Sequence, residues 1–98
     1  MKKPSKQNST NLVTLNVLTA RYGLNPLIQL DEIAEEFLKM SVATARRKAN
    51  NCELPFPVVR LSKSQKSPYV VHISELASYI DRLAEHASAR WEKFQLAA

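Results

Sequence analysis

The chain has 98 residues, and 45% of them are hydrophobic, so it can fold into one globular domain with a modest core. Its formal net charge of +5 favours an anionic partner, such as nucleic acid or an acidic membrane surface. No apolar run is long enough to span a bilayer, no apolar stretch follows the N-terminal lysines, and Cys52 is the only cysteine. These features predict a cytoplasmic protein without a signal peptide, a membrane contact or an internal disulfide.

The N-terminal part of the chain predicts a tail followed by a helix. Residues 1–9 are polar and basic and are expected to be disordered. A helix should follow a cap at Ser9 or Thr10 and run to Tyr22, because leucines recur at helical spacing. Gly23, the only glycine, stands where the end of a helix favours a left-handed residue.

Two short helices with a brief break between them are predicted next. After an Asn-Pro turn and a short extended segment over residues 27–30, apolar residues at helical spacing predict a helix over residues 31–38. This helix is acidic, with acids in its first turn, where the helix dipole favours them. Ser41 can cap a second, basic helix over residues 42–52. The pair has the outline of a helix-turn-helix, although many helical hairpins share that outline.

A β-hairpin is predicted directly after the basic helix. Pro55 and Pro57 end that helix and impose an extended chain. Residues 58–61 and 69–73 are rich in strand formers, and a polar tip separates them. A hairpin at this place is the arrangement of a winged helix, with the segment 60–69 as the wing.

A long amphipathic helix should follow from a cap at Ser74. Its first part can close the core, whereas residues 86–98 extend beyond what so small a domain can cover. The outer apolar positions approximate a heptad seam, which favours a homodimer. The alternative is that the helix folds back against the first helix and makes one core. The expected dimer contacts are Leu83, Ala87, Trp91 and Phe94.

The fold class expected from these elements is mainly α with a small β-hairpin. We interpret it as a winged helix-turn-helix over residues 10–85 with a long C-terminal helix.

Positive charge is concentrated in the middle of the chain. Residues 41–68 carry six basic side chains against one acid, Glu53, whereas residues 28–40 carry four acids against Lys39. Charged runs usually coat solvated surfaces. A basic block of this size favours a surface that contacts a polyanion, and double-stranded DNA is the expected partner.

The segment LPFPVVRLSKSQKSPYVVHISELASYIDR, residues 54–82, resembles the pyocin activator (PrtN) family of phage- and bacteriocin-associated transcriptional regulators. Its pattern P-x-V-R-x-x-x-S-Q-K-x-x-x-x-V-H-x-x-x-L-A-x-Y-I-D begins at Pro57. ARYG at residues 20–23 and ATARRKANNCELP at residues 43–55 add to the resemblance, which covers roughly residues 12–85. It implies DNA binding and promoter activation, with RNA polymerase as a further partner. The architecture is also similar to excisionase- and MerR-like winged helices, including the AlpA-type regulators.

The basic helix supplies the residues expected to recognise bases. Thr44, Arg47, Lys48 and Asn51 share one helical surface. Arg47 can pair with guanine and Asn51 with adenine, while Lys48 suits a phosphate. Arg46 lies about 100° away around the helix and can reach a phosphate or pair with an acid.

The hairpin tip supplies a second set of expected contacts. Lys63 and Lys66, beside small hydroxyls and an amide, suit a phosphate or the minor groove, although a solvated loop has the same composition. The complete set of predicted DNA-binding residues is Ser41, Thr44, Arg46, Arg47, Lys48, Asn51, Arg60, Lys63, Ser64, Gln65 and Lys66.

The sequence lacks the residue patterns of an enzyme or a metal site. His72 and His86 have no ligand partners at metal-binding spacing, and no His–acid pair close in sequence would activate Cys52. We therefore expect no catalytic residue, metal, cofactor or small-molecule substrate. Two alternative functions stay open: a DNA-bending, excisionase-like architectural factor, and an anti-repressor that binds proteins through its acidic helix.

Overall fold

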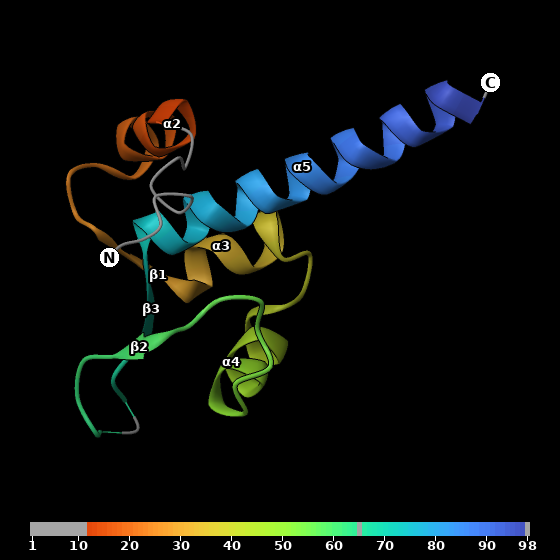
Figure 1. Ribbon diagram of the computed structural model, residues 1–98. Coiled ribbons are helices and arrows are strands. Elements are labelled where there is room, and N and C mark those ends of the chain that lie inside the picture. The colour runs from red at the N-terminus through yellow and green to blue at the C-terminus, as the bar shows by residue number, and fades with distance from the viewer. Residues whose placement is uncertain (1–11, 65, 98) are drawn as a thin grey trace, which may run out of the picture.

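The structure, a computed structural model, describes residues 12–64 and 66–97. Within these ranges the chain forms four helices and a small three-stranded antiparallel sheet (Figure 1). The elements are α2 (Leu12–Tyr22), β1 (Leu27–Gln29), α3 (Leu30–Phe37), α4 (Val42–Asn50), β2 (Val59–Arg60), β3 (Tyr69–His72) and α5 (Ile73–Ala97). The predicted tail over residues 1–9, the cap at Ser9 or Thr10, and Gln65 lie outside the described residues.

Local chemistry sets the ends of α2 and the start of α4. Gly23 has a φ of 87°, and its N–H donates to the carbonyl of Thr19 at 2.8 Å, which ends α2 as predicted. Ser41 has an extended backbone, and its Oγ accepts a hydrogen bond from the N–H of Thr44 at 3.2 Å. Ser41 therefore caps α4, which confirms that prediction.

Three helices have boundaries that differ from the prediction by one or two residues. The acidic helix spans Leu30–Phe37 rather than residues 31–38. The basic helix ends at Asn50 rather than at residue 52, because Cys52 takes a left-handed φ of 57°. The long helix begins one residue early, at Ile73, so Ser74 lies in its first turn and is not its cap. The N–H of Ser74 donates instead to Nδ1 of His72 at 3.1 Å, which gives that imidazole a structural partner.

The sheet has the order β1-β3-β2. The predicted hairpin forms, with Val59 opposite Val70 and Arg60 opposite Tyr69, but β2 is only two residues long. Of the segment 27–30, predicted only to be extended, residues 27–29 form the third strand, β1, on the other side of β3, whereas Leu30 begins α3. A hydrogen bond of 2.7 Å from the N–H of Ile73 to the carbonyl of Pro26 adds to this pairing.

The core lies where α3, the sheet and the first part of α5 meet. Its largest fully buried side chains are Leu30, Ile33, Val71 and Leu76. Buried alanines, Ala34 on α3 and Ala45 and Ala49 on α4, are among the core residues. Because alanine side chains are small, α3 and α4 can pack closely against each other. One face of α4 therefore lies against the domain, and the opposite face is exposed to solvent.

Helix α5 runs well past the body of the domain (Figure 1). Its first part packs against α2, where Oγ1 of Thr14 donates a hydrogen bond to Oδ1 of Asp81 at 2.8 Å. From Arg82 to Ala97 every side chain is exposed. The alternative in which the whole helix folds back on α2 is therefore wrong, because α2 covers only its beginning. Among the described residues, no helix combines the length and apolar character needed to cross a membrane.

Candidate nucleic-acid interface

Helix α4 presents its basic side chains to solvent. Arg46 and Arg47 are exposed, Lys48 is half-buried, and Asn51 directly after the helix is exposed. This orientation follows from the sequence, because the small residues Ala45 and Ala49 occupy the face that packs on the domain.

Arg46 is anchored to α3 by an ion pair with Asp31. Its Nε donates to Oδ1 of Asp31 at 3.1 Å, and its Nη2 makes a second contact with Oδ2. This forked hydrogen bonding raises the pKa of Arg46, as does the Coulomb attraction of the carboxylate. Of the two partners that the sequence left open for Arg46, the structure places the acid beside it.

Arg47 and Asn51 keep their side chains unengaged. Within the described ranges, neither side chain makes a hydrogen bond or an ion pair, and the same holds for Lys48. The hydroxyls of Ser41 and Thr44, by contrast, bond to each other at 3.0 Å at the start of the helix. The side chains of Arg47 and Lys48 on α4, and of Asn51 directly after it, are therefore available to contact a partner.

Serine hydroxyls shape the hairpin tip. Oγ of Ser62 accepts from the N–H of Ser64 at 3.2 Å, and Oγ of Ser64 accepts from the N–H of Lys66 at 3.1 Å. Oγ of Ser67 accepts from the N–H of Ser62 at 3.2 Å. Such side chain to backbone bonds hold a turn in one conformation. The sequence predicted Ser64 as a DNA contact and did not predict that its hydroxyl accepts a hydrogen bond from the loop backbone. Serines two residues apart, such as Ser62 and Ser64, can indicate such bonds.

The side chains of the tip lysines take no part in this network. Lys63 and Lys66 are exposed, and in the described part of the chain neither makes a side-chain ion pair. Figure 1 shows the hairpin tip and α4 extending from the same side of the body. The basic residues Arg47 and Lys48 belong to α4, and Lys63 and Lys66 belong to the hairpin loop, so both elements on this side of the body carry positive charge.

Arg60 and Tyr69 occupy the base of the hairpin. The guanidinium of Arg60 lies 4.8 Å from the centre of the Tyr69 ring, and its Nη2 donates to the carbonyl of Ser64 at 2.8 Å. The hydroxyl of Tyr69 donates to Oδ1 of Asn50 on α4 at 3.3 Å. Sequence reasoning missed both Tyr69 and Asn50, because their contact joins positions that are far apart in the chain.

The acids of α3 are partly used inside the domain. Asp31 holds Arg46, and Glu36 pairs with Arg21 of α2, whose pKa is raised by that hydrogen bond. Glu32 and Glu35 are exposed. Two of the four acids thus tie neighbouring helices to α3, which weakens the case for this helix as a docking surface for proteins.

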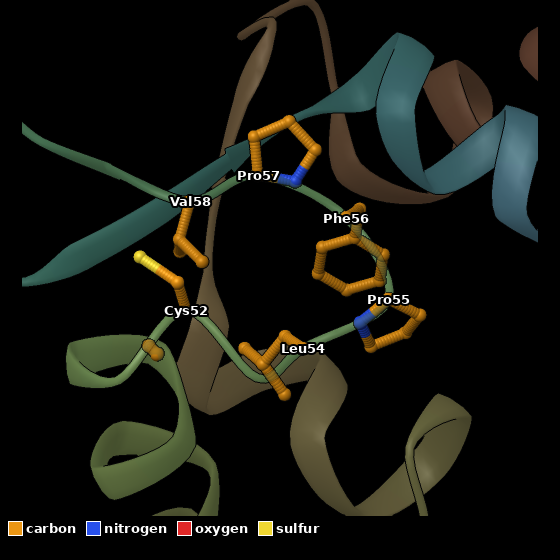
Figure 2. Close-up of a pocket in the computed structure, with 7 residues that line it drawn as sticks. Cys52, Leu54, Pro55, Phe56, Pro57 and Val58 are labelled. Atoms are coloured by element: carbon orange, nitrogen blue, oxygen red, sulfur yellow. The ribbon is translucent and has the colours of Figure 1, made fainter.

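A shallow apolar pocket of about 420 Å³ lies beside the C-terminal end of α4. Figure 2 shows the chain from Cys52 to Val58 curving around it, with Leu54 and Phe56 among the lining side chains. The lining contains no titratable cluster, and the described residues hold no group of three or more His, Cys, Asp or Glu side chains that could bind a metal. The one ionisable side chain in this lining is the thiol of Cys52.

The apolar residues predicted to contact a second subunit are exposed on α5. Leu83 is 52% exposed, and Trp91 and Phe94 are each 63% exposed. The guanidinium of Arg90 lies 5.7 Å from the centre of the Phe94 ring, which covers part of that ring within the helix.

Comparison with known proteins gives one match. A family model described as pyocin activator protein PrtN matches residues 14–87, from the first turn of α2 to the middle of α5. No curated protein and no solved structure matches the chain.

Proposed function

The chain belongs to the pyocin activator protein PrtN family, and from this premise we propose that it activates transcription by binding double-stranded DNA directly. Family membership implies a transcriptional activator of pyocin genes, which is not an enzyme. A protein with this role acts at promoters, so RNA polymerase is proposed as its second partner.

For the binding mode we propose a winged helix-turn-helix. Helices α3 and α4 form the helix-turn-helix, α4 enters the major groove, and the β2–β3 loop contacts the backbone or the minor groove. The observation that carries this proposal is that Arg47, exposed on α4, and Asn51, exposed directly after its last residue, both have side chains without a partner among the described residues. Arginine and asparagine are the side chains that read guanine and adenine by paired hydrogen bonds.

Titration of labelled duplex DNA, followed by fluorescence anisotropy over a range of salt concentrations, tests the function. Binding should weaken steeply as salt rises, because cationic side chains displace counterions from the phosphates. Affinity that did not depend on salt would contradict the proposal. Genome-wide mapping of bound sites would then give the operator, and a bending assay on that site would distinguish an activator from an architectural factor.

Replacing Lys66 by alanine tests the hairpin tip. We expect weaker binding to all sequences alike, with the slope of log affinity against log salt reduced by about 0.9, the value for one lost phosphate contact. Lys93→Ala is the matched control, because Lys93 is an exposed lysine on the outer part of α5. An unchanged affinity and slope for Lys66→Ala would remove the tip from the interface.

We also propose that the protein is a homodimer formed through the outer part of α5. The proposal is based on Trp91 and Phe94, which are exposed on the part of α5 that extends beyond the rest of the domain. Aromatic side chains often contribute much of the binding energy of protein interfaces. Sedimentation equilibrium at micromolar concentration should give a dimer for the wild type. The double variant with Trp91→Ala and Phe94→Ala should be a folded monomer with the helical circular dichroism signal of the wild type, and Gln95→Ala should stay a dimer. A monomeric wild type would end this proposal.

A further inference from the structure

We propose that Arg60 and Tyr69 are positioning residues, which fix the hairpin relative to α4 so that both reach one DNA duplex together. This inference rests on the proposed function. In it, Arg60 and Tyr69 support DNA binding without contacting DNA themselves. Its elements are four residues linked in a chain of contacts: Asn50, Tyr69, Arg60 and Ser64.

The first link joins the sheet to α4. Tyr69 is the first residue of β3, and Asn50 is the last residue of α4. The hydroxyl of Tyr69 donates to Oδ1 of Asn50 at 3.3 Å, across 19 positions of the sequence. Among the described residues, this is the hydrogen bond that ties the hairpin to the helix.

The second link joins the base of the hairpin to its tip. Arg60 pairs with Tyr69 in the register of β2 and β3, and its guanidinium lies over the Tyr69 ring at 4.8 Å. From there Nη2 reaches the carbonyl of Ser64 at 2.8 Å. Nε of Arg60 is buried and has no hydrogen-bond partner. The guanidinium is thus committed to the hairpin by two contacts, and its Nε is closed to solvent.

The hairpin needs such a brace. β2 contains only two residues, and a long connection separates it from β3. A two-stranded ribbon of this size has little stability of its own. A tip that moved freely would lose conformational entropy on binding DNA, which lowers affinity, whereas a tip held in place loses less. The brace therefore raises DNA affinity through preorganisation.

The polar contacts of the brace can be removed without emptying the core, although the ring of Tyr69 packs against it. Tyr69 and Arg60 are half-buried, Asn50 is exposed, and none of the three belongs to the fully buried set. Tyr69→Phe removes one hydroxyl and keeps the ring, so the domain should fold as before. Arg60→Gln removes the charge and the stacking and leaves a shorter, uncharged polar side chain.

The slope of log affinity against log salt distinguishes a brace from a phosphate contact. We expect Arg60→Gln and Tyr69→Phe each to lower DNA affinity by about three- to tenfold, the range for one lost hydrogen bond or stacking contact. The slope should stay at the wild-type value in both variants, because the number of phosphate contacts does not change. Lys66→Ala is the internal reference, since there the slope should fall.

A double-mutant cycle tests the link to α4. Asn50→Ala and Tyr69→Phe should each weaken DNA binding, and the double variant should be no weaker than the worse of the two, because both remove the same hydrogen bond. Thermal unfolding of all variants is measured alongside, and the midpoints should stay close to the wild-type value.

Three results would overturn the inference. A reduced salt slope for Arg60→Gln, equal to that of Lys66→Ala, would make Arg60 a phosphate contact. Additive losses for Asn50→Ala and Tyr69→Phe would show that the two residues act separately. If the variants lost affinity in proportion to their loss of thermal stability, the contacts would stabilise the fold without positioning the hairpin for DNA. A wild-type protein without salt-dependent DNA binding would instead overturn the proposed function itself, so the two failures are distinguishable.

Discussion

Replacing Arg47 by alanine is expected to reduce affinity for the operator by about 1–3 kcal/mol and to relax the preference for one base pair of the site. Arg47 is exposed on α4, and its side chain has no partner in the described part of the chain. Its guanidinium can therefore approach a guanine without first breaking an internal contact. Arg46, its neighbour, would have to leave Asp31 to do the same.

The measurement is a comparison of affinities for the operator and for variants with each base pair changed. For Arg47→Ala, the loss should be large on the operator and small on a site that already lacks the recognised base pair. Lys66→Ala supplies the contrast, because a lost phosphate contact lowers affinity for every sequence by a similar factor. A uniform loss for Arg47→Ala would identify Arg47 as another phosphate contact and would contradict base recognition.

Replacing Leu76 by alanine is expected to destabilise the folded domain by about 2–5 kcal/mol, a large part of the stability of a small domain. Leu76 has an exposed fraction of 0% and lies on α5 where that helix meets the rest of the core. The substitution removes buried apolar surface and leaves a cavity that the surrounding helices and sheet can fill only in part.

Urea unfolding, followed by circular dichroism, measures this effect as a shift of the midpoint at an unchanged slope. Leu96→Ala is the matched control, because Leu96 lies on the same helix with 88% of its surface exposed. Both substitutions are made in the Trp91→Ala and Phe94→Ala background, which should be monomeric, and there the effect of Leu96→Ala should be within about 0.5 kcal/mol. Equal effects for the two variants would mean that α5 does not contribute to the core as the structure describes.

Local signals made much of the fold predictable. The cap at Ser41, the left-handed Gly23 and the strand formers around the hairpin act over a few residues, so the sequence reveals them without knowledge of the tertiary structure. Where a boundary was wrong, another local effect decided it. The left-handed backbone at Cys52 ended α4 two residues early. His72, rather than Ser74, accepts a hydrogen bond from the first turn of α5.

Contacts between distant segments could not be predicted in the same way. The third strand, β1, has three residues, and its pairing with β3 leaves no periodic pattern in the sequence. The Arg46 to Asp31 ion pair was one of two alternatives, and only the packing of α4 on α3 decides between them. The hydrogen bond between Tyr69 and Asn50 depends on the position of the sheet beside α4, which no local rule gives.

The candidate site shows the same division. The basic character of α4 and of the hairpin tip follows from composition, and the exposed faces agree with it. Which residues of the site make internal contacts and which are available to a partner does not follow from composition. Hydroxyls at the tip are used to hold the loop, and Arg60 is stacked on Tyr69, although both types of residue suit DNA equally well in the sequence.

The pairing of β1 with β3 also has a consequence for how the protein folds. The two strands are joined edge to edge, yet α3, α4 and β2 all lie between them in the chain. Closing so long a loop is costly in entropy until the enclosed helices have packed, so this sheet should form late and limit the folding rate. Once closed, it links the base of the hairpin to the helices within one cooperative unit. The strands of the hairpin then should not open one at a time, and local opening at the base of the hairpin requires opening of the sheet.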